Sequence, residues 1–277
     1  MLDGKRLRVL CNPLTVTAGE VLDNVLSHED IRETAYFALA LREGAGGGAE
    51  DEYWCLAGDA KLSKVAPSGW KQPPRTLQHN SVSSDSVFVV HLRFRHFPDD
   101  VDELRDPKNK HLFYLQLRRD VSEARYRMSA SAHLGLAGKV RPSSWPFFSP
   151  EMTFIYLISQ ALQTEFGDFS EDIHGEGDYF LLEHYLPAAA VRQLGGEAAR
   201  QNLVRLHRAH LGQSQSKTEI KYCKEVQRND NYGFHNFAVT EGKKHVAAAG
   251  NSNRKKHLGI HLQVMYWLTR TRDSIDS

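Results

Sequence analysis

The chain has 277 residues, of which 41% are hydrophobic, 10% aromatic and 25% charged, and this composition of a globular protein excludes wholesale disorder. Its 35 Lys and Arg residues nearly balance its 34 Asp and Glu residues, so no net basic field attracts nucleic acid and any anion binding must rest on local patches. The longest aliphatic and aromatic run, Phe154–Ile158, is far shorter than the roughly 18 residues that cross a bilayer.

The first hundred residues predict strands around one helix. Leu7, Val9 and Cys11 recur at every second position, which is the pattern of a half-buried strand. The spacing of Thr17 and Glu20 is that of a capping box, in which each side chain satisfies a free amide group at the start of a helix. The helix is predicted at about 18–28, and further strands at 36–41, 52–56 and 87–97.

From about residue 99 the hydrophobic pattern becomes helical. The helix predicted at 151–166 is apolar almost all round, as expected for a central buried helix. Gly and Pro residues between the first two helices predict an irregular loop at 131–150. Capping-box spacing at Ser216–Glu219 predicts the start of another helix. The three long helices are predicted at 110–127, 151–166 and 197–211, and later strands at 234–239 and 258–268.

Five segments and a later turn resemble signatures of FERM domains. The turn, Tyr232–His235, is similar to the crossing into the last lobe of the family. All the matches occur in the family's order between about residues 60 and 240. The chain is therefore identified as a member of this family, similar to the FERM regions of a large PDZ-containing non-receptor tyrosine phosphatase and of FERM and PDZ scaffold proteins. The five segments are Lys61–Lys71, Phe113–Asp120, Ala161–Asp168, Glu183–Pro187 and Glu219–Arg228.

The resemblance implies an α+β, multi-lobed fold. A ubiquitin-like lobe is expected at 1–98 and an all-helical lobe, similar to acyl-CoA-binding protein, at 99–213, with an irregular insertion at about 131–150. A linking helix and the start of a PTB/PH-like lobe are expected at 214–277. The family's first strand would precede Asp3, and most of its last lobe would follow Lys243. We therefore expect a module truncated at both ends.

Each residue that could carry chemistry also has a structural interpretation. A cysteine phosphatase needs an Arg six positions after its Cys, whereas Asn229 holds that position after Cys223, which lies on an apolar helical stripe. His207 and His210 lack the i, i+4 spacing and the third ligand of a zinc site. The glycines at 44–48 lead into acidic residues that would repel phosphate. We therefore expect no catalytic residue, no metal and no cofactor.

The strand at 87–97 interleaves basic and aromatic side chains, as surfaces that bind single-stranded nucleic acid also do. Alternation along a strand places Leu92 and Phe94 on the face opposite Arg93 and Arg95. We expect the apolar residues in the core, both arginines toward solvent and no nucleic-acid partner. The three scattered cysteines and the absence of a secretory signal at the start predict a cytoplasmic protein with reduced thiols.

Two basic groups are the candidate binding residues. FERM domains bind phosphoinositide headgroups through basic residues of the first and third lobes, and the resemblance places Lys61 near one such position. A generic solvated surface is an equal alternative. Capture of a peptide tail at an edge of the third lobe would require a formed sheet. The lipid-headgroup candidates are Lys61, Lys64, Lys71, Arg75, Arg254, Lys255 and Lys256.

The resemblance implies a non-enzymatic adaptor, peripheral at the membrane, the cytoskeleton or cell junctions. Its expected partners are phosphoinositides of the inner leaflet, cytoplasmic tails of membrane proteins, and cytoskeletal or junctional proteins. Such a module would position a larger scaffold. The alternative is the N-terminal targeting fragment of a FERM/PDZ tyrosine phosphatase, with catalysis residing outside this chain.

Overall fold

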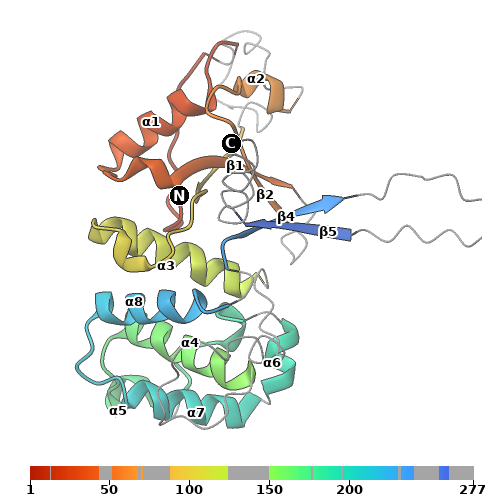
Figure 1. Cartoon of the computed structure of the whole chain (residues 1–277). Coiled ribbons are helices and arrows are strands. Elements are labelled where there is room, and N and C mark those ends of the chain that lie inside the picture. The colour runs from red at the N-terminus through yellow and green to blue at the C-terminus, as the bar shows by residue number, and fades with distance from the viewer. Residues whose placement is uncertain are drawn as a thin grey trace, which may run out of the picture. The chain divides into compact units, whose positions relative to one another are not determined.

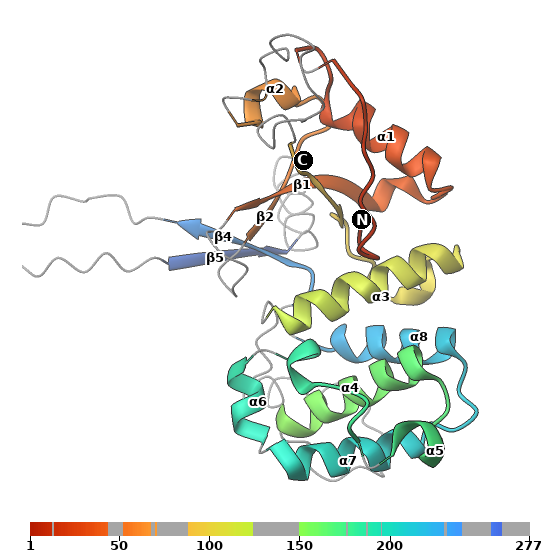
Figure 2. The same ribbon diagram turned by 180° about the vertical axis from the view of Figure 1, so that it is seen from behind.

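The computed structural model describes residues 1–12, 14–43, 52–67, 70, 88–123, 150–175, 177–186, 188–194, 196–229, 232–239 and 256–261. The chain forms two compact units, residues 1–229 and 230–277. The first unit contains a small sheet crossed by a helix and a group of packed helices, and the second contains a two-stranded sheet (Figures 1 and 2). This arrangement confirms the predicted mixture of helix and sheet. No helix in the described part of the chain is both long and apolar enough to cross a membrane.

The sheet region, residues 1–98 of the first unit, is built on three antiparallel strands in the order β2-β1-β3. The strand β1 is central because it pairs with β2 along one edge and with β3 along the other. The helix α1 packs against β1 (Figure 1). The elements are α1 (Ala18–His28), η1 (Thr34–Tyr36), β1 (Phe37–Glu43), β2 (Glu52–Cys55), α2 (Leu62–Val65) and β3 (His91–Phe94).

The start of α1 is the predicted capping box. The Glu20 backbone N–H donates to the Thr17 hydroxyl at 3.3 Å, and the Thr17 backbone N–H donates to the Glu20 carboxylate at 2.8 Å. Behind this cap, Val21, Val25 and Leu26 are buried. Capping and an apolar stripe therefore act together, and the helix spans the residues that the sequence predicts.

The N-terminal segment differs from its prediction, because residues 5–12 form no strand. Among the described residues no strand pairs with this segment, and Leu10 is 99% exposed. Alternation alone does not form a strand, since its backbone amides need a neighbouring strand. The predicted strand at 87–97 is also shorter, because its pairing with β1 extends only from His91 to Phe94.

The helical region, residues 99–229 of the first unit, is organised around α4. This helix packs against α7 and α8, and α3 packs against the other side of α8 (Figure 1). Leu157, Ile158 and Leu162 of α4 are nearly or fully buried, which confirms the predicted central helix. The elements are η4 (Val101–Glu103), α3 (Pro107–Ser122), α4 (Pro150–Phe166), α5 (Glu171–His174), η6 (Leu182–His184), α6 (Ala188–Leu194), α7 (Gly196–Arg208) and α8 (Gln215–Val226).

The start of α8 lies before the predicted capping box. Ser214, not Ser216, is the N-terminal cap, and its hydroxyl accepts a hydrogen bond from the Lys217 N–H at 3.4 Å. Glu219 does not return to cap the helix, because it is buried and its carboxylate lies 2.7 Å from His111 Nδ1 on α3. Helix packing therefore overrides the local spacing of Ser216 and Glu219.

The second unit contains the antiparallel strands β4 (Phe234–Val239) and β5 (Lys256–His261), with Phe234 opposite His261. Both strands are predicted by the sequence, although β5 begins two residues before the expected position. The predicted insertion at 131–150 lies outside the described residues except for Pro150, where α4 begins. The glycines at 44–48 also lie outside them. The proposed lobe boundaries stay predictions.

Candidate functional site

Lys61 and Lys64 are the predicted lipid-binding residues whose side chains the structure describes. Lys61 precedes α2, and an isolated bridge to Thr17 holds its backbone beside the start of α1. Lys64 lies in the last turn of α2, and both lysines are exposed. In the described part of the chain, no carboxylate forms an ion pair with either ammonium group. Both charges are therefore available to an external anion.

The other predicted basic residues are not assembled with these two lysines by the structure. Lys71, Arg75, Arg254 and Lys255 lie outside the described residues. Lys256 is the first residue of β5, in the second unit. A joint headgroup site of the first and third lobes consequently stays a prediction.

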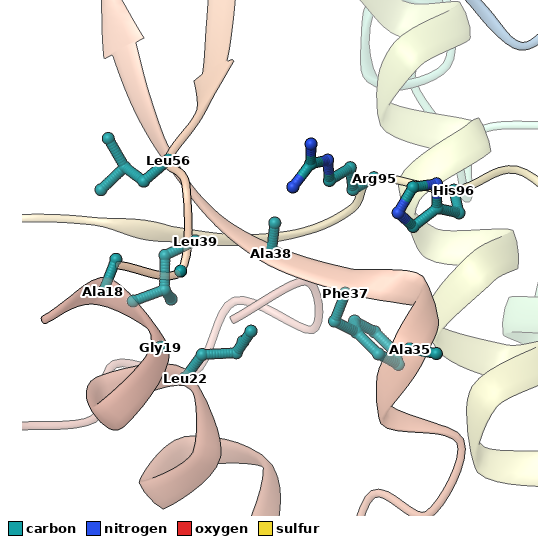
Figure 3. Close-up of a pocket in the computed structure, with 11 residues that line it drawn as sticks. Ala18, Gly19, Leu22, Ala35, Phe37, Ala38, Leu39, Leu56, Arg95 and His96 are labelled. Carbon is teal, nitrogen blue, oxygen red and sulfur yellow. The ribbon is translucent and has the colours of Figure 1, made fainter. Parts of the chain in front are cut away.

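A cleft of about 210 Å³ lies between α1 and the sheet (Figure 3). Leu22 of α1 and Phe37 and Leu39 of β1 give it apolar walls. On one side, the Gly19 N–H donates to the Gly58 carbonyl oxygen at 2.8 Å. A Cβ atom at Gly19 would lie 2.9 Å from this oxygen, so the close approach of α1 to the segment after β2 requires glycine.

Arg95 and His96, which follow β3, are the polar residues of this cleft (Figure 3). Their backbone N–H groups both donate to the Tyr36 carbonyl oxygen, at 2.7 and 3.2 Å, and this fixes the segment at the end of the sheet. Burial, followed by the positive charge of Arg95, lowers the pKa of His96. His96 is therefore neutral at pH 7, and Arg95 supplies the permanent charge of the cleft.

The sequence places Arg95 toward solvent, and this residue is indeed exposed. Its position at the mouth of an apolar cleft is not predicted, because it depends on the pairing of β1 with β3 and on the packing of α1. No local sequence pattern predicts either of these long-range contacts.

The predicted exposure of Arg93 is wrong, since this residue is only 5% exposed. Its guanidinium pairs with the carboxylate of Asp120 on α3 and lies 4.2 Å from the ring centre of Tyr53. Burial alone would lower the pKa of Arg93, but the nearby Asp120 carboxylate outweighs it and raises the pKa. The alternation rule fails here because α3 packs against β3 and places the Asp120 carboxylate beside Arg93.

The residues considered for chemistry have structural roles in the helical region. Cys223 is fully buried on α8, and burial raises the pKa of its thiol, which opposes formation of a nucleophilic thiolate. His207 is also fully buried; its Nδ1 lies 2.7 Å from the Tyr179 hydroxyl and its Nε2 lies 2.8 Å from the Gly167 carbonyl oxygen. The predicted burial of Cys223 is confirmed, and His207 is hydrogen-bonded within the helical core.

The fold is that of a multi-lobed α+β protein in which a helix-crossed sheet precedes a helical region and a further β unit. The model of the FERM N-terminal domain matches residues 1–68, and that of the FERM central domain matches residues 148–237. Together these matches cover more than half of the chain. The chain belongs to the FERM family, as its sequence signatures predict.

The relatives of the chain include a tyrosine phosphatase and a protein that contains FERM and PDZ domains. The chain is 34% identical over 244 residues to tyrosine-protein phosphatase non-receptor type 13 of Mus musculus, an alignment that covers 88% of this chain and 9% of that protein. It is 31% identical over 245 residues to FERM and PDZ domain-containing protein 2 of Mus musculus, covering 88% of this chain and 15% of that protein. The chain thus spans less than a fifth of these relatives, and the match to the phosphatase is to its FERM region, outside its catalytic domain.

Solved structures support the same fold at lower sequence identity. The complex of the FERM and C-terminal domains of Drosophila Merlin aligns with a TM-score of 0.58 and 20% identity, over 86% of this chain and 67% of that one. The MyTH4-FERM domain of Dictyostelium discoideum myosin VII aligns with a TM-score of 0.54 and 14% identity, over 89% of this chain and 42% of that one. These likenesses establish the fold.

Proposed function

We propose that this chain is a non-enzymatic FERM adaptor that binds phosphoinositides of the inner leaflet and cytoplasmic tails of membrane proteins. In this role it acts at the periphery of the membrane or of cell junctions, contacts cytoskeletal or junctional proteins and positions a larger scaffold. The proposed lobes are residues 1–98, 99–213 and 214–277. The observation that carries the lipid part is the pair of exposed lysines at α2 without an ion-pair partner among the described residues.

The charge of these lysines suits a reversible association. Each cation near an anionic leaflet contributes about 1 kcal/mol, so Lys61 and Lys64 alone provide a weak attraction that further basic residues would strengthen. Their positions support joint action, because Lys61 is the N-terminal cap of the short helix α2 and Lys64 lies within it. Cations that are already paired within a protein could not contribute in this way without first breaking those pairs.

Liposome sedimentation of the full chain tests this proposal. We expect binding to vesicles that contain phosphatidylinositol bisphosphate to fall about tenfold or more when Lys61→Glu and Lys64→Glu are combined. The matched control combines Arg192→Glu and Arg205→Glu, which make the same charge change at exposed helical positions. If the lysine variant and the arginine control lost equal binding, the effect would come from net charge and not from Lys61 and Lys64. Equal binding of the parent protein with and without the phosphoinositide would reject the proposal.

The relationship to a phosphatase favours a second candidate function. Over 88% of its length the chain aligns with the FERM region of a tyrosine phosphatase. This likeness supports a role in targeting a catalytic domain that lies elsewhere. Sequencing full-length transcripts of the same gene tests this candidate. A downstream phosphatase segment in any product supports the targeting role, whereas products that hold only PDZ segments favour the scaffold.

A further inference from the structure

The α1–sheet cleft has the features of a small built site. One wall is held by the Gly19 hydrogen bond to Gly58 and by a second bond, in which the Ala18 N–H donates to the Ala60 carbonyl oxygen at 2.9 Å. The opposite wall is the part of β1 from Phe37 to Leu39, which pairs with β3 along one edge and whose Leu39 carbonyl oxygen accepts from the Leu56 N–H at 2.8 Å on the other. Backbone hydrogen bonds therefore hold both walls, and the fold itself fixes the position of the cleft.

The size of the cleft limits what it can hold. An apolar cavity of about 150 Å³ accommodates a molecule the size of benzene, and drug-sized ligands occupy roughly 300 Å³ or more. At about 210 Å³, this cleft is suited to one large apolar side chain. It is too small for the two acyl chains of a membrane lipid.

The charge of the cleft indicates which group of a ligand would lie beside the inserted apolar side chain. No carboxylate is among the described residues that line it, and Arg95 has no ion-pair partner among those residues. Figure 3 shows the Arg95 side chain on the side of the β1 ribbon to which the Ala38 side chain, another part of the lining, points. A negative charge next to the inserted group would therefore meet an available guanidinium.

We propose that this cleft binds a short acidic peptide segment, which inserts one leucine-sized or phenylalanine-sized side chain between α1 and β1 and places a neighbouring carboxylate on Arg95. The inserted side chain acts as the anchor, and the ion pair with Arg95 selects acidic sequences. The site lies in the sheet region and is distinct from strand addition to the third lobe. It rests on the proposed capture of protein tails and does not depend on lipid binding.

Methyl NMR of the full chain tests the site with defined probes. The acetylated, amidated peptide Gly-Glu-Leu-Glu-Gly is titrated while the methyl signals of Leu22, Leu39 and Leu56 are followed. We expect these signals to shift together and saturably. The peptide Gly-Glu-Gly-Glu-Gly, which lacks the anchor, should leave them in place, and Gly-Gln-Leu-Gln-Gly should bind about threefold more weakly. Equal binding of all three peptides, or no shift at any of the three leucines, would overturn the proposal.

Two variants test the inserted side chain and the ion pair with Arg95 separately. Ala35→Leu adds a side chain at an exposed position of the cleft lining and should weaken the Glu-Leu-Glu peptide about tenfold or more, because the anchor loses its buried contacts. Arg95→Gln should weaken it about threefold and remove the preference over the Gln-Leu-Gln peptide. The control is Arg6→Gln, which neutralises an exposed cation outside the cleft and should not change the affinity.

Vesicle binding of the same variants distinguishes this site from the lipid proposal. If the peptide fails to bind while phosphoinositide vesicles still depend on Lys61 and Lys64, the cleft proposal is overturned and the lipid proposal stands. If Arg95→Gln abolishes vesicle binding and no peptide shifts the leucine methyls, the mouth of the cleft belongs to a lipid site, which also overturns the peptide proposal.

Discussion

In the sheet region, Lys61, Lys64 and Arg95 are exposed and have no ion-pair partner among the described residues. In the helical region, Arg118 pairs with Glu165 on α4, and Arg208 pairs with Glu171 on α5 at 3.0 Å. These three cations of the first region are unpaired in the described part of the chain, whereas Arg118 and Arg208 of the second connect its own helices. The binding that we propose therefore rests on cations of the sheet region.

The buried side chains of the two regions differ in polarity. Apart from Arg93, the described buried side chains of the sheet are apolar, as Phe37 and Leu39 are, whereas α4 buries Ser159 and Gln160 beside His210. Buried polar groups must be hydrogen-bonded in one specific arrangement, and this makes a packed helical core less tolerant of change. An apolar cleft has no such requirement and can admit a foreign side chain.

The contact between the sheet region and the helical region is made by buried polar side chains. Gln116 of α3 donates to the Phe94 carbonyl oxygen at 3.1 Å and accepts from the Phe94 N–H at 2.7 Å, so its side chain satisfies the outer edge of β3. Beside it, the buried carboxylate of Asp120 pairs with Arg93. The sheet region is thereby fixed to the helical region through polar groups that water cannot replace.

The largest effect is expected from breaking this buried pair. Asp120→Ala leaves the Arg93 guanidinium buried without its carboxylate, and the free energy of unfolding should fall by about 3–5 kcal/mol in urea titrations. Glu225→Ala, which breaks the more exposed pair with Arg228, should cost less than about 1 kcal/mol. If the two variants were equally stable, the regions would not be joined by the Arg93–Asp120 pair.

The sequence predicts the local features of this molecule better than its contacts. The capping box of Thr17 and Glu20 and the apolar stripe behind it specify α1, because both signals involve neighbours along the chain. The burial of Arg93 and the position of Arg95 depend on α3 and β1, which are far away in sequence. Lys61 and Lys64 are predicted as binding residues from the family resemblance, whereas the cleft appears only once α1, β1 and the Gly58 segment are assembled.

A smaller effect is expected from acidification, and it should originate in the helical region. Burial, followed by the positive charge of Lys221, lowers the pKa of His210 to about 4, compared with about 6.5 in an unfolded chain. The unfolded state therefore binds more protons between these values. The stability contribution of His210 is complete above about pH 6.5 and is lost as the pH falls toward 4.

Urea titrations at pH 7 and pH 5 measure this contribution. We expect the parent protein to lose about 1–2 kcal/mol more on acidification than His210→Gln. The exposed His184 provides the control, since His184→Gln should lose as much as the parent. His111 acts in the opposite direction, because its hydrogen bond to Glu219 raises its pKa, and it is unchanged in both variants. An identical loss in His210→Gln and in the parent would contradict the assignment.

The smallest effect is expected where the sheet region carries its unpaired cations. Lys61→Gln, Lys64→Gln and Arg95→Gln should each change the free energy of unfolding by less than about 0.5 kcal/mol, because none breaks a side-chain ion pair within the described part of the chain. Arg118→Gln should cost about 1–2 kcal/mol, since Arg118 loses both Glu165 and a cation–π contact 4.8 Å from the ring centre of Tyr185. A cost above about 1 kcal/mol for either lysine would show that it supports the fold, and a structural lysine would not be free to bind a headgroup.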